Sequence, residues 1–420
     1  MQVSNLLLRK KKIESFSTAA QKFPQNTRWV FSDAFLFEKA GSQLETLPFY
    51  MVFLNWLLLS PLLLKLVSAI SLVPVLLSVI ILKWRFDWRF KSKKNRTEKY
   101  CNRIFVGFGA AAEEPMLAWY RDQANDAVAY IDSASSLAKW HHVPFFRLIS
   151  RTKNNLIKGN SALKNLPEEL KCLRALLHFS IVKHVALYSY WDVWFSELNS
   201  AAVDIDEIVA IHSGLSTFAA VDNNFKVNFL AHGLIRHSIV FPDFHRVELM
   251  TEPEVLHVKN RFKNGVNISL QAYRSAGKNS VLKSRIILFI AADGSEQELD
   301  LFMRFASRFS SFQIKMYLRP RNNGSGNKLV HGEYFSNIKV LCSDGSLLDL
   351  LTEIKPKIVV STASAGLIEA KHIGCIPVTL ASANDRVIID MVFPMLDEFL
   401  NWPRDDSEVS CALLNLSKLS

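Results

Sequence analysis

The stretch Asn337–Leu380 decides the fold that we expect, and it reads NIKVLCSDGSLLDLLTEIKPKIVVSTASAGLIEAKHIGCIPVTL. An apolar strand over Lys357–Val360 leads into a turn rich in small and hydroxyl residues, which runs from Ser361 to Gly366. A helix over Leu367–Ile373 follows, and Ile376–Leu380 reads as the next parallel strand. A helix N-terminus offers free N–H groups and a positive dipole end, and hydroxyls add donors. The stretch therefore predicts a phosphate site, although an ordinary capped helix start explains the same residues.

The rest of the chain continues this alternation on both sides. Short apolar strands are expected at 103–107, 128–131, 208–212, 227–231, 247–251, 285–291, 313–318 and 338–341. Helical stretches separate them at about 115–127, 161–200, 214–223, 253–261 and 297–310. Alternation of this kind predicts parallel sheets covered by helices, hence an α/β fold. We expect two Rossmann-like domains that face a cleft.

Composition sets the expected domain boundaries. An N-terminal region covers 1–46, a membrane segment with a basic flank covers 47–99, and a first Rossmann-like domain covers 100–262. Residues 263–284 are rich in Gly, Asn, Ser and Lys and read as a linker. The second Rossmann-like domain then covers 285–420.

The membrane segment rests on the run Leu47–Leu82, which holds a single charged residue, Lys65. Some 20 apolar helical residues cross the hydrocarbon of a bilayer, so Leu62–Leu82 alone is long enough. One kinked span, a re-entrant hairpin and an apolar helix pair inside a soluble domain all remain open. The basic flank Lys83–Lys99 predicts that the side after the segment is cytoplasmic.

The charge of the chain indicates the class of its partner, and its cysteine content indicates its compartment. The net charge of +11 indicates an anionic partner, and its clustering next to the apolar run favours membrane lipids. No pattern typical of nucleic-acid binding is present, so no nucleic-acid partner is expected. Five scattered cysteines without CxxC spacing predict free thiols in a reducing compartment.

Several titratable residues follow predicted strands, where ligands of open α/β sheets bind. His232 and Gly233 follow the strand at 227–231, and an imidazole there is suited to take a proton from an acceptor hydroxyl. Glu113 and Glu114, after the first strand, are the rival candidates for the base. A histidine at a strand end is, taken alone, more often structural. Asp204-Ile205-Asp206 has the sequence of a DxD metal-binding motif, but it precedes the strand at 208–212 rather than following it. No metal site is therefore expected.

The segments FLAHGLIR, LRPR and VVSTASAGLIEAKHIGCIPVTL occur in this order within Ile208–Leu380. Together they resemble bacterial GT-B glycosyltransferases of surface polysaccharide synthesis: capsule sialyl- and polysialyltransferases, capsule Kdo transferases and CDP-glycerol glycerophosphotransferases. The resemblance implies that His232 is the catalytic base, beside Gly233. It implies donor binding by Arg319, Arg321, Ser361, Thr362, Ser364, Gly366 and Glu369, with Glu369 on the ribose or the sugar. The sialyltransferase-like members carry His-Pro where this chain has Arg319-Pro320.

These patterns lead to a membrane-attached glycosyltransferase as the expected function. It would move a sugar from a nucleotide donor, with CMP-sugars slightly favoured, to a glycan or glycolipid at the cytoplasmic face of the inner membrane. No cofactor is expected, because helix dipole, hydroxyls and arginines would stabilise the departing phosphate. A CDP-polyol phosphotransferase and a non-catalytic membrane scaffold or glycan-binding subunit are the alternatives.

Overall fold

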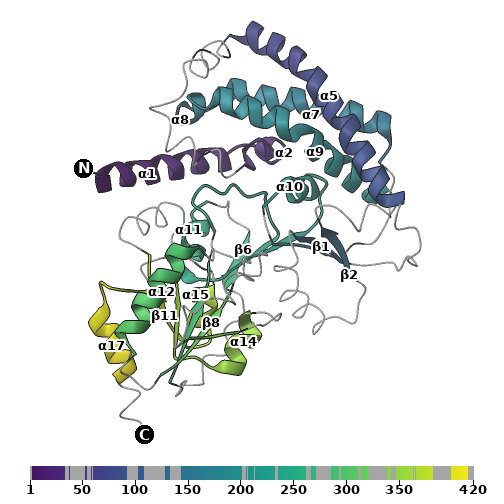
Figure 1. The fold of residues 1–420 in the computed structure, drawn as a ribbon. Coiled ribbons are helices and arrows are strands. Elements are labelled where there is room, and N and C mark those ends of the chain that lie inside the picture. Colours follow the sequence, from purple (N-terminus) through teal and green to yellow (C-terminus); the bar gives the residue numbers. More distant parts are fainter. Residues whose placement is uncertain are drawn as a thin grey trace. The chain divides into compact units, whose positions relative to one another are not determined.

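The computed structural model divides the chain into two compact units, Met1–Ser269 and Leu270–Ser420. It describes residues 2–33, 37, 53, 58, 60–91, 103–107, 128–132, 143–200, 205, 207–211, 213–231, 235–261, 266–270, 285–292, 295–310, 314–320, 338–341, 347–362, 364, 366–381 and 399–414. Each unit contains one six-stranded sheet (Figure 1).

The sheet of the first unit has the order β2-β1-β3-β4-β5-β6. Its strands are β1 (Arg103–Gly107), β2 (Val128–Asp132), β3 (Glu207–Ala210), β4 (Val227–Leu230), β5 (Arg246–Leu249) and β6 (Asn267–Leu270). The pairs from β2 through to β5 are parallel. β3 and β4 are almost wholly buried, as apolar strands covered on both faces must be.

The sheet of the second unit has the order β12-β11-β10-β7-β8-β9, and every neighbouring pair is parallel. Its strands are β7 (Ile286–Ile290), β8 (Lys315–Arg319), β9 (Ile338–Val340), β10 (Ile358–Ser361), β11 (Ile376–Thr379) and β12 (Leu400–Asn401). Numbered within the unit, this is the strand order 3-2-1-4-5-6 of the Rossmann fold.

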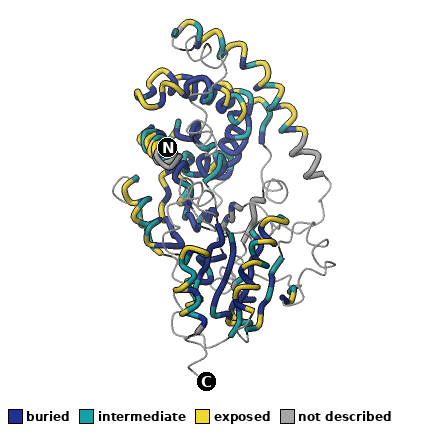
Figure 2. The backbone as a smooth tube through the Cα atoms, turned by 60° about the vertical axis from the view of Figure 1, so that its left-hand side comes forward, coloured by how far each residue is buried: buried dark blue, intermediate teal, exposed yellow. Residues whose placement is uncertain are grey.

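Helices cover both sheets. The first unit holds α1 (Gln2–Gln21), α2 (Gln25–Arg28), α5 (Pro61–Lys91), α7 (Phe145–Ala162), α8 (Glu168–Lys171), α9 (Arg174–Ser200), α10 (Leu215–Asp222) and α11 (Glu252–Lys259). The second unit holds α12 (Glu296–Arg308), α14 (Leu347–Ile354), α15 (Gly366–His372) and α17 (Asp406–Leu414). Figure 2 shows many buried residues in the central strands and exposed residues along the outer helices.

One core of the second unit joins α12 and α17 to the same face of the sheet. Phe302 and Phe305 of α12 pack with Phe289 of β7, and Val409 of α17 belongs to the same cluster. Ser295 caps the N-terminus of α12 by accepting the backbone N–H of Glu298 at 3.2 Å. The apolar stripe of α12 thus faces the strands, while its charged residues other than the buried Glu298 face outward.

The α/β class is confirmed, and the predicted strands of both sheets are present within a residue or two of their expected ends. The structure adds β6, which lies inside the predicted linker 263–284, and also β12, α14 and α17. The helix expected at 115–127 lies outside the described residues. The N-terminal region, for which no element was expected, forms the 20-residue helix α1.

α5 contains Leu62–Leu82, the part of the predicted membrane segment that alone is long enough to cross a bilayer. Among the described residues it is the one helix long and apolar enough to cross a bilayer, over Leu62–Trp84. It runs without interruption past Pro74, and it packs against α7 and α9. α5 is therefore part of the folded first unit.

Candidate functional site

The second sheet reverses its strand order between β7 and β10. From β7, the first strand of the unit, β8 and β9 extend the sheet to one side, while β10, β11 and β12 extend it to the other. Because β7 and β10 are parallel neighbours, their carboxyl ends lie side by side. Open α/β sheets bind ligands at this switch point. The predicted phosphate turn, which starts at the end of β10, lies at this point.

Ser361 is the last residue of β10 rather than the first residue of the turn. Its side chain is fully buried, and its hydroxyl donates a 2.7 Å hydrogen bond to the carbonyl oxygen of Ile290, the last residue of β7. This hydroxyl therefore holds the two strands together at the switch point. It does not face a ligand in this conformation.

Thr362 follows Ser361 and is partly exposed. Its hydroxyl donates a 2.6 Å hydrogen bond to the carboxylate of Glu298, in the first turn of α12. The backbone N–H of Ala292, after β7, donates to both oxygens of the same carboxylate at 2.9 and 3.1 Å. Glu298 is only 2% exposed. It thus ties the end of β10 to the loop after β7.

Ser364 and Gly366 form the start of α15. The hydroxyl of Ser364 accepts the N–H of Gly366 at 3.1 Å, and its carbonyl accepts the N–H of Leu367. A Cβ atom on Gly366 would lie 2.5 Å from Leu347 of α14 and 3.2 Å from Ile290, so only glycine fits without displacing them. Two N–H groups that the sequence assigns to a phosphate are thus already bonded within the turn.

Arg319 ends β8, one strand beyond β7 from the turn. With strands spaced about 4.8 Å apart, it lies about 10 Å across the sheet from the end of β10. Its side chain is partly buried, and this burial lowers the pKa of the guanidinium, while the charge of Glu369 on α15 acts to raise it. Arg319 and Glu369 therefore share one electrostatic environment at the carboxyl edge.

Five predicted site residues lie outside the described residues: Glu113, Glu114, His232, Gly233 and Arg321. The ends of their strands are described. β1 ends at Gly107 and β4 at Leu230. Both strands are parallel to β3, their common neighbour, so both ends belong to the carboxyl edge of the first sheet.

The loop after β4 is held by a buried glutamate. Glu254, fully buried in the first turn of α11, accepts the backbone N–H of Ile235 at 2.8 Å and that of Met250 at 3.2 Å. The Thr251 hydroxyl donates to the same carboxylate. Burial raises the pKa of Glu254, although these hydrogen bonds act to lower it. The backbone at Ile235, where the described chain resumes after β4, is thus fixed to α11.

The N-terminal helices hold the same loop from another direction. Gln21 exchanges two 2.9 Å hydrogen bonds with the backbone of Phe241, one through its amide nitrogen and one through its oxygen. Ser17 donates to the carbonyl of His237 at 2.8 Å, and the buried Arg28 donates to Asp243 at 2.6 Å. α1 and α2 therefore help to build the candidate catalytic edge.

One group of possible metal ligands comes together among the described residues: Glu14, His237 and His257. The Nδ1 atom of His237 lies 3.1 Å from Oε1 of Glu14. Burial, together with the smaller effects of the charges of Arg261 and Lys10, lowers the pKa of His257 to about 3. These two cations oppose a metal ion, so the group fits better as a link between α1 and the loop after β4.

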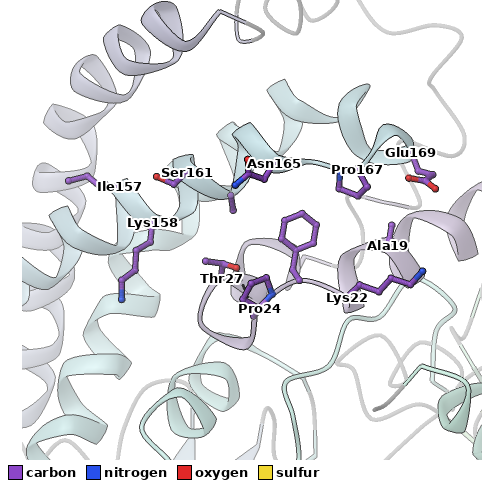
Figure 3. Close-up of a pocket in the computed structure, with 12 residues that line it drawn as sticks. Ala19, Lys22, Pro24, Thr27, Ile157, Lys158, Ser161, Asn165, Pro167 and Glu169 are labelled. Atoms are coloured by element: carbon purple, nitrogen blue, oxygen red, sulfur yellow. Dashed lines mark hydrogen bonds between the residues drawn. The ribbon is translucent and has the colours of Figure 1, made fainter. Parts of the chain in front are cut away.

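A cavity of about 550 Å³ lies in the first unit, between α1–α2 and α7–α8. Figure 3 shows Lys22 and Pro24 on one side of it and Ser161 and Asn165 on the other. Among the described residues, no predicted catalytic or donor-binding residue lines it.

Sequence reasoning missed Glu298 and Glu254, which organise the two sheet edges. Each stands three residues after a hydroxyl residue, in Ser295–Glu298 and Thr251–Glu254, and both pairs fit the capping-box pattern. That spacing was available in the sequence. What it did not reveal is that each carboxylate also accepts N–H groups from neighbouring loops.

No family model and no curated protein matches the chain. Solved structures that are similar to the chain at low sequence identity include the following three. UDP-GlcNAc 2-epimerase from Neisseria meningitidis bound to UDP-GlcNAc is 11% identical over 68% of this chain and 85% of its own, with a TM-score of 0.37. The glycosyltransferase SnogD from Streptomyces nogalater is 13% identical; the match covers 75% of this chain and 94% of SnogD, with a TM-score of 0.40. UDP-GlcNAc 2-epimerase from Methanocaldococcus jannaschii is 11% identical; the match covers 75% of this chain and 92% of the epimerase, with a TM-score of 0.41.

Proposed function

We propose that the chain is a glycosyltransferase that uses a nucleotide-activated sugar and binds its nucleotide at the switch point of the second sheet. The strand order of that sheet is the observation that carries the proposal. It brings the turn after β10 and the loop after β7 to the edge where Rossmann-type sheets take nucleotides. Arg319 adds a guanidinium at the same edge.

Arg319 and Glu369 keep the roles expected from the sequence, whereas the proposed roles of Ser361, Ser364 and Gly366 change. Arg319 would pair with the donor phosphates, since a guanidinium can hold two phosphate oxygens at once. Glu369, on the helix after the turn, would hold the ribose or the sugar. Ser361, Ser364 and Gly366 would shape the turn, because their polar atoms and close contacts are used within it. Thr362 keeps acceptor capacity beyond its bond to Glu298.

The proposed chemistry needs these roles and a general base, for which His232 is the candidate. The acceptor hydroxyl loses its proton to His232 and attacks the anomeric carbon of the donor sugar. The bond between that carbon and the phosphate oxygen breaks, and the nucleotide leaves with its negative charge facing Arg319. Fixed cationic groups stabilise charge that develops in a transition state, so this design requires no metal ion. Glu113 and Glu114 are the alternative bases.

A donor panel tests the proposal. Purified protein is incubated with CMP-, CDP-, UDP- and GDP-activated donors and a mixed glycolipid acceptor, and released nucleotide and product are measured. Turnover of one donor with transfer of its sugar is the expected result. Transfer of a polyol phosphate from a CDP donor would convert the assignment to a phosphotransferase. Absence of turnover and of nucleotide binding with every donor would leave only the scaffold function.

The base is tested within the same assay. His232→Ala should lower kcat by at least ~100-fold, the ordinary contribution of a general base. His245→Ala is the matched control, because His245 is an exposed histidine just before β5. Full activity of His232→Ala would transfer the role to Glu113 or Glu114.

A further inference from the structure

One side of α5 carries an unbroken row of exposed apolar side chains. Leu62 is 77% exposed and Trp84 is 68% exposed. Between them the row continues at intervals of three or four residues through Leu66, Ile70, Val73, Leu77 and Ile80, and the exposed Ile81 lies next to Ile80. Residues at this spacing share one face of a helix. We call this row the α5 stripe. In Figure 2, α5 is the topmost helix, and exposed residues recur along its length.

The opposite side of α5 is part of the protein core. Leu64, Val75 and Val79 are buried there, and α5 packs against α7 and α9. His178 of α9 lies within 3.1 Å of the Ser71 hydroxyl of α5 and within 3.0 Å of the Asn160 side chain of α7. All three polar residues are buried. These contacts fix α5 lengthwise to two helices of the folded unit.

A basic groove runs along the flank of the stripe. A cavity of about 340 Å³ between α5 and α7 is lined by apolar residues and by three exposed lysines, Lys65, Lys153 and Lys164. On its other flank α7 borders the cavity of Figure 3, where Lys22 and Lys158 stand. Ammonium groups therefore border the apolar surface on the side of α7.

These contacts restrict the orientation that α5 can take relative to a bilayer. α7 carries Arg147, Arg151, Lys153 and Lys158, so a bilayer-crossing α5 would draw this charged neighbour into hydrocarbon. Lying parallel to the membrane surface, the α5 stripe enters the lipid while the lysines remain at the headgroup level. We propose that α5 is an in-plane membrane anchor whose basic groove binds anionic phospholipid headgroups. This inference is independent of the proposed function.

Vesicle binding tests the lipid partner. The full-length protein should co-sediment with vesicles of phosphatidylcholine and phosphatidylglycerol, and much less with phosphatidylcholine alone. Lys65→Glu/Lys153→Glu/Lys164→Glu should weaken binding to the anionic vesicles at least tenfold, because each surface lysine adds attraction to anionic lipid. Lys226→Glu/Lys259→Glu/Lys315→Glu, on exposed lysines that belong neither to α5 nor to the lining of the groove, is the charge-matched control. Equal loss in both variants would overturn the headgroup site.

A second variant isolates the α5 stripe. Leu66→Glu/Ile70→Glu/Leu77→Glu should abolish vesicle binding at both lipid compositions while leaving the circular dichroism spectrum unchanged, since all three side chains are exposed. Leu256→Glu, on an exposed leucine of α11, is the control for an added charge at an apolar position. Unchanged vesicle binding by the triple variant would refute the anchor.

Measuring the depth of α5 in the bilayer distinguishes an in-plane helix from a helix that crosses the membrane. Single spin labels at positions 62, 66, 70, 73, 77, 81 and 84, in a chain with its five cysteines replaced, report depth in the bilayer by electron paramagnetic resonance. An in-plane helix predicts one shallow depth for all seven positions. A profile that is deepest near position 73 and shallow at both ends would show a crossing helix and overturn the proposal.

Discussion

In the proposed donor site, Arg319 is the residue on which donor binding should depend most. Arg319→Ala should raise KM for the donor at least tenfold, because charge-assisted hydrogen bonds contribute about 1.5–3 kcal/mol. Arg319→Lys should recover part of the loss, since it keeps the charge but not the two-pronged geometry. Initial rates at varied donor concentration measure both effects. Arg304→Ala, on an exposed arginine of α12, is the control, and an unchanged KM in Arg319→Ala would remove Arg319 from the site.

The bond between Thr362 and Glu298 makes a prediction about stability. Thr362→Val removes one donor from a carboxylate that is 2% exposed, which should lower the free energy of unfolding by about 1–3 kcal/mol. Urea denaturation measures the difference. Ser307→Ala removes an exposed hydroxyl bond on α12 and should cost almost nothing. Equal stability of Thr362→Val and the control would contradict the linking role of Glu298.

Asp222 gives the first unit a pH dependence. Burial raises the pKa of its carboxyl from 3.8 to about 6, against hydrogen bonds from Tyr188 and from Gln25 that act to lower it. A raised pKa means that the folded state favours the protonated acid. The resulting stabilisation is complete below pH 4 and is lost as the pH rises through about 6, by at most about 3 kcal/mol. Asp222→Asn should flatten this part of a stability–pH curve, and an unchanged slope would contradict the assignment.

At the scale of elements, the start of α15 depends on Gly366. A methyl group there would press on Leu347 of α14 and on Ile290 of β7. Gly366→Ala should therefore lower the free energy of unfolding by about 1–3 kcal/mol, the usual cost of overpacking. Thermal unfolding measures the loss. A fully stable Gly366→Ala protein would show that α14 gives way without cost.

α1 is expected to stabilise the loop after β4 through Gln21. Gln21→Ala removes both hydrogen bonds to the backbone of Phe241 and leaves those two backbone groups buried. It should cost about 2 kcal/mol and increase amide hydrogen exchange around residue 241. Lys22→Ala, at the exposed neighbouring position, should change neither quantity. Equal exchange in both variants would mean that α1 does not stabilise the loop.

Alternation of apolar strands and helices predicted most elements, because buried parallel strands such as Ile286–Ile290 form continuous apolar runs. It missed β6 and β12, which are short and carry polar residues. It also missed α1, whose residues do not separate into clear apolar and polar faces, although Ser17 and Gln21 reach the loop after β4. Contacts between segments more than 200 residues apart leave no local signal.

For the whole molecule, sequence order alone did not reveal which strands are neighbours. The turn after β10 was predicted as a ligand site from its own residues, and only the pairing of β10 with β7 identifies it as the switch point. Pairing also changed individual roles, since it brought the Ser361 hydroxyl to Ile290. The predicted base His232 and its rival candidates Glu113 and Glu114 lie outside the described residues.

We propose that the switch point of the second sheet binds the donor nucleotide. Hydrogen exchange measured by mass spectrometry, with and without saturating CMP, CDP, UDP or GDP, tests it most directly. One nucleotide should protect the peptides that cover residues 290–298, 319–321 and 361–369 at least tenfold, and Arg319→Ala should abolish this protection. Protection confined to the first unit, or protection by none of the four nucleotides, would contradict the claim.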